Sequence, residues 1–483
     1  MGKEGIQKIK PVLEKIVGPR NVSDAPAVCQ AYAFNPFMGT HFSAKPDMVV
    51  MPQSAEQVSA ILKAANQYQV PVTPKGAIGL TGTGGPIYGG VLLDLVQMDK
   101  IISIDAKNMK AVGEAGCSFY KLAQALFKQD LILPTPTWYT GASLAGSALL
   151  PSNGIGKTRY GPDIDLVEGF EVVLPNGDII NVGSMAYAKT DFGPFYRYIY
   201  GPDLVGLFAK SNGVFGIVTK VAHFCLRKPK YWGFHTYYWP RQGAEDLTRA
   251  MIESTAMEVF DAHLNDKWRW LREGNPVGPE DAYFTLTFAV TAENETELKG
   301  KEQAVHECCR SCQGTYLPDF AQYFHLSWPT AFLAGYPRRP LPVRNRGEGF
   351  NLDEFIYPTS AFPEVYGKIE EILKKYGVWE GFPPIKPIYD GYPMKRLIIA
   401  SQTWVRIKDH DPGQYQQFLT ARDELRDWYI HKGGMYQQRM PPLLPDFTYD
   451  VQRGAIDLAK TIKKALDPNN ILSPSIYDGR SEQ

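Results

Sequence analysis

A loop rich in glycine and threonine lies between two apolar segments in the first quarter of the chain. It reads Val-Thr-Pro-Lys-Gly-Ala-Ile-Gly-Leu-Thr-Gly-Thr-Gly-Gly-Pro over residues 72–86. Glycine lets the backbone turn its N–H groups inward and approach a ligand closely, and the threonine hydroxyls add further donors. The flanking segments 68–72 and 90–95 are apolar and predict strands. This combination predicts a loop that binds a pyrophosphate.

Two further loops of small residues follow, at 139–147 and 154–161. A single glycine-rich loop is usually a surface turn. Three such loops in one region favour a shared ligand, and the alternative is that the glycines serve tight turns alone.

The balance of charge bounds the class of protein. The 483 residues include 51 basic and 51 acidic side chains, and 44% of the residues are apolar. A chain of this length can bury a large core and should form two or three domains. Because nucleic-acid-binding proteins usually carry a basic face, we expect no nucleic-acid partner.

The N-terminus lacks the patterns of a targeting signal. Residues 1–8 have no apolar core of the kind that a secretory signal needs, and Ile6 breaks the myristoylation pattern. No long uninterrupted apolar run occurs, so we expect no membrane span. These features predict a cytoplasmic protein.

Three of the six cysteines lie close together, at Cys308, Cys309 and Cys312. A structural zinc or iron–sulfur site needs four ligands, usually with a second matched pair, and no such pair follows. His306 is a conceivable fourth ligand, but one short segment would have to bend to supply all four. We therefore expect no metal, and interpret these cysteines as buried thiols on a helix.

Helix and strand signals alternate along the first half of the chain. Ser54 and Gln57 form a capping pattern that opens a helix running to about Gln69. The turn at 175–178 contains Asn-Gly and predicts a hairpin between strands 169–174 and 179–182. Further strands are expected at 48–51, 110–114 and 216–222, and helices at 119–128 and 204–210.

The pattern changes near 228–232. Longer elements follow, with helices expected at 243–255, 295–309 and 415–431, and strands at 282–290 and 397–406. The stretch 320–350 is rich in aromatic residues and proline and shows no period, which is often a sign of function. The tail 451–467 predicts an amphipathic helix.

The motifs at 45–58, 72–86, 93–101, 171–178, 200–208, 216–220 and 465–474 occur in an order that resembles one family. This is the vanillyl-alcohol oxidase and p-cresol methylhydroxylase family of flavoproteins, and the resemblance covers nearly the whole chain. It implies an α+β fold with an FAD-binding domain of two α+β subdomains and an α+β cap domain for substrate. The implied divisions are an N-terminal arm at 1–45, the FAD domain at 46–228, the cap at 229–440, and a segment at 441–483 that packs back on the FAD domain.

The resemblance assigns flavin contacts to the small-residue loops and to one strand. Close packing is the alternative role for Gly161 and Gly216. The implied cofactor-binding residues are Pro74, Lys75, Gly76, Ala77, Ile78, Gly79, Thr81, Gly82, Ser143, Gly146, Gly161, Gly216 and Val218.

The chain departs from the phenol-oxidising members of the family. Thr81 stands where those enzymes hold a phenolate-binding tyrosine, and their C-terminal Tyr-Arg pair becomes Tyr436 and Gln437, with Arg439 two residues further on. Residues 79–84 are closer to 2-hydroxy-acid dehydrogenases of the glycolate or D-lactate type. In the segment 352–358, neither His nor Tyr falls at the flavin-linking position, although Tyr357 is close, so we expect non-covalent FAD.

The implied reaction is oxidation of an alcohol, alkylphenol or hydroxy-acid C–H bond by hydride transfer to flavin N5. Tyr436 would contact the substrate oxygen, Arg439 would balance negative charge, and His325 would act as base. A packed aromatic, a surface salt bridge and a buried histidine are the respective alternatives. The expected substrate pocket consists of Trp404, Gln402, Gln437 and Trp138.

The electrons must then leave the flavin. We prefer a dehydrogenase that uses a protein acceptor, namely a cytochrome, an electron-transfer flavoprotein or an iron–sulfur subunit, and expect a homodimer or a hetero-complex. Two alternatives are a non-redox relative of the flavin enzyme that makes ether lipids, and a non-catalytic flavin subunit of an electron-transfer complex.

Overall fold

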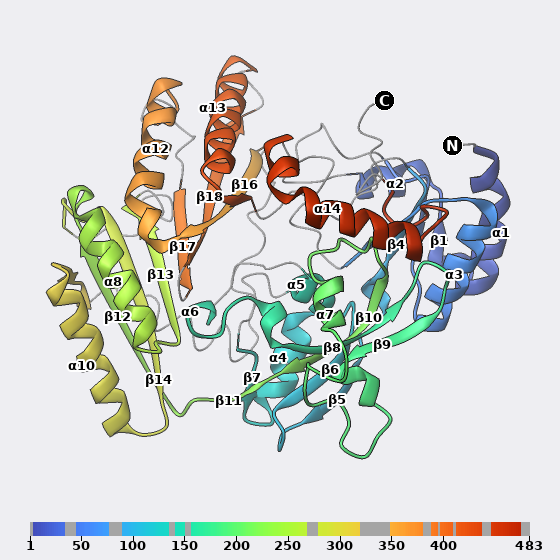
Figure 1. Ribbon diagram of the computed structural model, residues 1–483, viewed down its shortest axis with the longest axis horizontal. Helices are drawn as coiled ribbons and strands as arrows, with labels where there is room; N and C mark the ends of the chain where they lie inside the picture. Colours follow the sequence, from blue (N-terminus) through green and yellow to red (C-terminus); the bar gives the residue numbers. More distant parts are fainter. Residues whose placement is uncertain are drawn as a thin grey trace.

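The computed structural model is shown in Figure 1. It describes residues 3–33, 45–76, 89–134, 141–149, 156–267, 279–318, 348–379, 388–394, 397–408, 412–436 and 446–474.

A four-stranded sheet and its helices form the N-terminal end of the molecule (Figure 1). The elements are α1 (Lys3–Val17), β1 (Val22–Ser23), α2 (Pro26–Tyr32), β2 (Met48–Val50), α3 (Ala55–Tyr68), β3 (Val72–Lys75) and β4 (Val91–Asp94). The strand order is β1-β2-β4-β3, and β4 pairs in parallel with both β2 and β3. Buried side chains of α1 and α3 join those of the strands in one core.

Helix α3 shows where the sequence prediction holds and where it fails. Ser54 Oγ accepts a hydrogen bond from the N–H of Gln57, which confirms the predicted helix start. The predicted strand at 68–72 is wrong. Helix α3 continues through Tyr68, Gln69 closes it in the left-handed conformation (φ 54°), and the strand begins only at Val72. Val70 is buried just after the helix cap and donates its N–H to the carbonyl of Ala65, so its hydrophobicity marks the end of the helix and does not indicate a strand.

An antiparallel five-stranded sheet, ordered β5-β6-β10-β8-β9, packs on the same core. Its strands are β5 (Ile101–Asp105), β6 (Lys110–Glu114), β8 (Val167–Val173), β9 (Ile179–Gly183) and β10 (Ile217–Phe224), and a small pair adds β7 (Leu131–Ile132) and β11 (Leu226–Arg227). The helices here are α4 (Phe119–Phe127), α5 (Leu144–Leu149), α6 (Lys157–Tyr160) and α7 (Leu204–Phe208). The predicted hairpin is confirmed: β8 pairs with β9, and Gly177 in the turn has φ 88°.

The second large unit is an antiparallel eight-stranded sheet, ordered β15-β12-β14-β13-β17-β18-β16-β19. Its strands are β12 (Tyr231–Trp239), β13 (Asp261–Asp266), β14 (Phe284–Ala292), β15 (Thr315–Tyr316), β16 (Glu348–Pro358), β17 (Ile388–Met394), β18 (Leu397–Lys408) and β19 (Met435–Tyr436). The helices α8 (Ala244–Ala256), α10 (Glu295–Ser311), α12 (Phe362–Lys375) and α13 (Pro412–His431) belong to this unit. Their apolar side chains and those of the strands form a separate core. The helices therefore cover one face of the sheet, and the other face is turned toward α6 (Figure 1).

The C-terminal helix α14 (Asp446–Leu466) returns to the N-terminal unit. Lys463 is buried, forms an ion pair with Asp467, and donates a hydrogen bond to the carbonyl of Leu472 (2.7 Å). Residues after the helix bond to the backbone of Val72 at the start of β3. The end of the chain thus braces the strand that leads into the glycine-rich loop. Among the described residues, no helix is long and apolar enough to cross a membrane.

Candidate functional site

The first and second small-residue loops meet at Gly76. A Cβ atom built on Gly76 would lie 2.4 Å from Ser143 Oγ and 3.9 Å from the Cα of Gly146. Ser143 Oγ in turn accepts a hydrogen bond from the N–H of Gly146 (3.3 Å) at the start of α5. Only glycine fits at 76, because any side chain would occupy the space that brings the two loops together. The structure therefore unites three of the predicted cofactor residues.

A buried carboxylate holds the strands at the base of the glycine-rich loop. Asp94, at the end of β4, accepts hydrogen bonds from Tyr32 Oη (2.7 Å) and from the N–H of Val96 (3.0 Å). Lys75, at the end of β3, lies 3.8 Å from the same carboxylate and 5.2 Å from the centre of the Tyr32 ring. Burial and the neighbouring Asp94 raise the pKa of Tyr32, so the phenol stays protonated and acts as the donor in its hydrogen bond to Asp94. These contacts fix the point from which the loop departs.

Other predicted cofactor residues have clear packing roles. A Cβ on Gly216 would lie 2.6 Å from Val172 Cγ1, and Val218 is buried in the core. Gly161 ends α6 with φ 79°, where a Cβ would lie 2.8 Å from Asp165 Oδ2. Pro74 packs against Gly213, whose Cβ would lie 2.3 Å from Pro74 Cγ. These observations support the packing alternative for Gly161 and Gly216.

A buried polar contact joins α6 to β13. Thr158 Oγ1 donates to Asp261 Oδ1 (3.3 Å) and accepts from the N–H of Ala262 (2.8 Å). Asp261 and Lys157 are fully buried beside this contact. Burial raises the pKa of Asp261 well above its usual value, although the charge of nearby Lys157 opposes the shift. A carboxyl group in this setting tends to keep its proton at neutral pH and can donate a hydrogen bond.

Further polar side chains share this face of the sheet. Asp261, His263 and Asn265 alternate along β13 with residues of the helix-side core, so they lie on the opposite face. Asn265 is fully buried, and neither of its side-chain polar atoms has a hydrogen-bond partner among the described residues. Thr285 lies opposite Asn265 in the ladder and is also buried. Because buried amides are nearly always paired, this orphaned amide fits a polar ligand at the junction.

Sequence reasoning missed this cluster. Residues 261–266 read Asp-Ala-His-Leu-Asn-Asp, in which polar and apolar residues alternate over the first five positions. That period is typical of a strand with one core face. The alternation could have indicated this strand, but a short segment with polar residues at both ends is also typical of a surface loop.

Three of the predicted catalytic and pocket residues lie on strands of the large sheet. Tyr436 lies on β19 and pairs with Phe355, Gln402 pairs with Asp353, and Trp404 pairs with Asn351. The strands that carry Tyr436, Gln402 and Trp404 are therefore neighbours through β16. His325, Arg439, Gln437 and Trp138, together with Ala77, Ile78, Gly79, Thr81 and Gly82, lie outside the described residues.

Tyr357, the tyrosine nearest the expected flavin-linking position, lies in the helix-side core. It is 3% exposed, its ring centre lies 5.9 Å from that of Tyr429, and burial raises the pKa of its phenol well above the usual range. A neutral phenol packed among apolar side chains is poorly placed to link a flavin. This placement supports non-covalent binding.

A surface hollow of about 350 Å³ lies elsewhere, on the segment 184–200. Aromatic side chains line it, including Phe195, Tyr196 and Tyr198, each of which is more than half exposed. None of the predicted site residues is among its described lining.

Two family models match the chain. An FAD-binding domain matches residues 46–183, and the C-terminal domain of FAD-linked oxidases matches residues 445–476. The first match contains the glycine-rich loop and the Ser143 loop, and the second contains the segment that braces β3. FAD is therefore the cofactor of this chain.

Known proteins resemble the chain, one of them over nearly its whole length. A glycolate oxidase subunit of Bacillus subtilis is 30% identical over 96% of both chains. A D-lactate dehydrogenase of Anaerostipes hadrus is 32% identical over 40% of this chain and 39% of its own, and a 4-cresol dehydrogenase flavoprotein subunit of Pseudomonas putida is 30% identical over 38% and 36%.

Solved structures share the fold. A 4-ethylphenol oxidase from Gulosibacter chungangensis has a TM-score of 0.81 at 17% identity and covers 99% of this chain and 98% of its own. A p-cresol methylhydroxylase with bound substrate also has a TM-score of 0.81, at 18% identity, and covers 99% and 97%. These matches confirm the predicted α+β architecture of a flavin domain with a cap.

Proposed function

Because the chain belongs to the family of FAD-linked oxidoreductases that includes p-cresol methylhydroxylase, we propose that it is an FAD-dependent dehydrogenase of a small 2-hydroxy acid. The similarity to a glycolate oxidase subunit carries this proposal, since it extends over 96% of both chains. The departures at Thr81 and Gln437 from the phenol-oxidising pattern support it.

The described residues fit the cofactor. Gly76, Ser143 and Gly146 form a cradle without side-chain bulk, and Asp94 and Lys75 hold its base. When bound, FAD supplies the two-electron oxidant for cleavage of the substrate C–H bond. With Tyr357 buried in the core, we expect the flavin to be held without a covalent link.

The junction between α6 and the large sheet suits a small polar substrate. Asp261, Asn265 and Thr285 are buried polar side chains on this face of the sheet. Lys157, which is fully buried on α6, lies within electrostatic reach of Asp261. In this proposal Arg439 balances the substrate carboxylate, Tyr436 contacts the hydroxyl oxygen, and His325 takes its proton.

An alkylphenol is the second candidate substrate. Two enzymes whose solved structures share the fold support it, because they are named for phenolic substrates or were crystallised with phenolic compounds. At under a fifth identity these matches speak for the fold, so we rank this candidate below the hydroxy acids.

We infer that the electrons pass to a separate acceptor protein. Relatives named as subunits, of a glycolate oxidase and of a cresol dehydrogenase, support this inference. A non-catalytic flavin subunit would share these relatives but would not be reduced by any small alcohol.

The test is turnover of the FAD-loaded protein with an artificial electron-accepting dye. Glycolate and D-lactate are compared with 4-cresol and vanillyl alcohol at equal concentration. We expect glycolate or D-lactate to reduce the dye, and 4-cresol and vanillyl alcohol not to reduce it. Reduction with the phenols alone would favour the second candidate, and reduction with none would favour the flavin-subunit alternative.

A further inference from the structure

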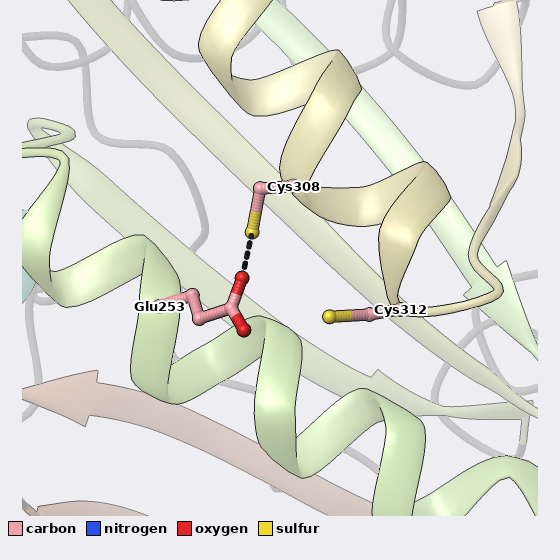
Figure 2. A group of neighbouring side chains, drawn as sticks. All are labelled: Glu253, Cys308 and Cys312. Carbon is pink, nitrogen blue, oxygen red and sulfur yellow. Dashed lines mark hydrogen bonds between the residues drawn. The ribbon is translucent and has the colours of Figure 1, made fainter.

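Three potential metal ligands lie between helices α8 and α10, on the helix-covered face of the large sheet. Figure 2 shows Cys308 on helix α10, Cys312 at the C-terminal end of that helix, and Glu253 on the facing helix α8. Their ligand atoms, two Sγ and a carboxylate oxygen, all lie within 4.8 Å of one another. The sequence alone offered three thiols and His306 from one segment, and the packing of α8 on α10 brings in a carboxylate from another helix.

The spacing of the two cysteines suits a shared ion. Cys308 and Cys312 are four positions apart, so they lie one above the other on the same face of the helix. This is the arrangement by which two helical side chains can bind one zinc ion. The backbone N–H of Cys312 donates to the carbonyl of Cys308 (3.1 Å), so the helical turn persists to the second cysteine.

The distance between ligand atoms on the two helices also matches that in a metal centre. Cys308 Sγ lies 3.7 Å from Glu253 Oε2. In a tetrahedral zinc site with ordinary Zn–S and Zn–O lengths, a sulfur and an oxygen ligand are about 3.6 Å apart. The two atoms therefore need little movement to bind the same ion.

The surroundings hold the ligands in place. The indole Nε1 of Trp239 donates to the carbonyl of Cys312 (2.7 Å), and Ser311 Oγ lies 3.8 Å from Cys312 Sγ. Both cysteines are buried, whereas Glu253 is exposed. A cation can therefore reach the site from solvent through the carboxylate and bind sulfur atoms that packing has already positioned.

The nearby charges permit a divalent cation. Arg249 lies close enough to interact electrostatically with both Cys312 and Glu253. It forms an ion pair with Asp246 on its own helix (2.5 Å).

We propose that Glu253, Cys308 and Cys312 form a site for a thiophilic divalent cation, with Zn²⁺ as the best match. Two sulfurs and one carboxylate oxygen are ligands that zinc prefers, and the fourth position is open to water. Binding would release a proton from each thiol and clamp α8 to α10.

The experiment is a zinc titration of the reduced, FAD-loaded protein against a chromophoric chelator. We expect one zinc per chain, with binding lost in Cys308→Ser and in Cys312→Ser. Glu253→Gln should weaken binding by about tenfold or more, since an amide oxygen is a poorer zinc ligand than a carboxylate. The control variants are Cys29→Ser, a buried thiol of the N-terminal unit, and Glu307→Gln, an exposed carboxylate on α10.

Thermal unfolding gives a second readout. Zinc should raise the melting temperature of the wild-type protein and of both controls, but not that of Cys308→Ser. The exposed position of Glu253 makes its variant safe for folding, so the proposal can fail cleanly. Equal zinc affinity in the wild type and in Glu253→Gln and Cys308→Ser, or no zinc bound at micromolar concentration, would overturn it.

Discussion

At the scale of single residues, the absence of a side chain at Gly76 is central to the proposed cofactor cradle. A methyl group there would lie 2.4 Å from Ser143 Oγ, closer than carbon and oxygen can approach. Either Ser143 or the loop must then move, and such overpacking costs about 1–3 kcal/mol. We predict that Gly76→Ala is purified with much less bound flavin, as measured by the ratio of flavin to protein absorbance.

Two variants separate this steric effect from a general loss of stability. Gly300→Ala places the same methyl group on α10, where nothing lies within 4 Å of it, and should keep full flavin content. In Gly76→Ala combined with Ser143→Ala, the nearest remaining atom would be Ser143 Cβ at 3.6 Å, an ordinary contact, so the melting temperature should recover. If Gly76→Ala alone binds flavin normally, the cradle does not depend on this contact.

A buried carboxyl group predicts a pH dependence. Burial raises the pKa of Glu168 to about 7, and Oε2 has no hydrogen-bond partner among the described residues. The folded state therefore binds this proton more tightly than the unfolded state, whose glutamate titrates near its ordinary value of about 4.3. The resulting stability is present at acid pH and is lost as pH rises through about 7.

We predict that Glu168→Gln is more stable than the wild type at pH 8, and that this advantage shrinks toward pH 5. Melting temperatures across that range test it, with Glu307→Gln on the exposed face of α10 as control. A difference between the variant and the wild type that does not change with pH would contradict the assignment.

At the scale of elements, the C-terminal segment secures the strand that carries the flavin loop. Lys463 and Asp467 are 4% and 2% exposed, and Asp467 also accepts from the N–H groups of Ile471 and Leu472. Removing the lysine would leave a buried carboxylate without its cation, which typically costs about 3–5 kcal/mol. We predict this loss for Lys463→Met in denaturant unfolding, and less than about 0.5 kcal/mol for the neighbouring, exposed Lys464→Met. Equal effects of the two would refute the role of the ion pair.

Elements with local signals were predictable from sequence. Helix α3 begins at a cap that can be read from Ser54, and the β8–β9 hairpin follows from its Asn-Gly turn. Strand β12 and helix α12 were not anticipated. Strand β12 is aromatic along much of its length, so no two-residue alternation marks it. Helix α12 begins with Phe-Pro and has no side-chain cap at its first residue.

The site was only partly predictable. Gly76, Ser143 and Gly146 could be chosen because glycine and serine in a loop have a direct meaning for a phosphate ligand. Asp261 and Asn265 could not, because their importance comes from burial against α6, which depends on contacts between residues about a hundred positions apart. Glu253 entered the proposed zinc site in the same way, through helix packing.

At the scale of the whole molecule, two cores are separated by a polar junction. One core spans the flavin-binding sheets, and the other lies between the large sheet and its helices. Acid precipitation unfolds the protein, so a cofactor held only by non-covalent contacts is released, whereas a covalently held one stays with the protein. We predict that acid precipitation of the purified protein leaves the flavin absorbance in the supernatant. A yellow pellet would mean a covalent link.

The central claim is that this chain oxidises a 2-hydroxy acid at the carbon that bears its hydroxyl group. The most direct measurement is the rate of flavin bleaching after anaerobic mixing with D-lactate or glycolate, compared with the same acid deuterated at that carbon. We predict that the flavin bleaches. The bleaching rate should be clearly slower with the deuterated acid, because the C–H bond breaks in that step. Flavin that stays oxidised with both acids but bleaches with 4-cresol would contradict it.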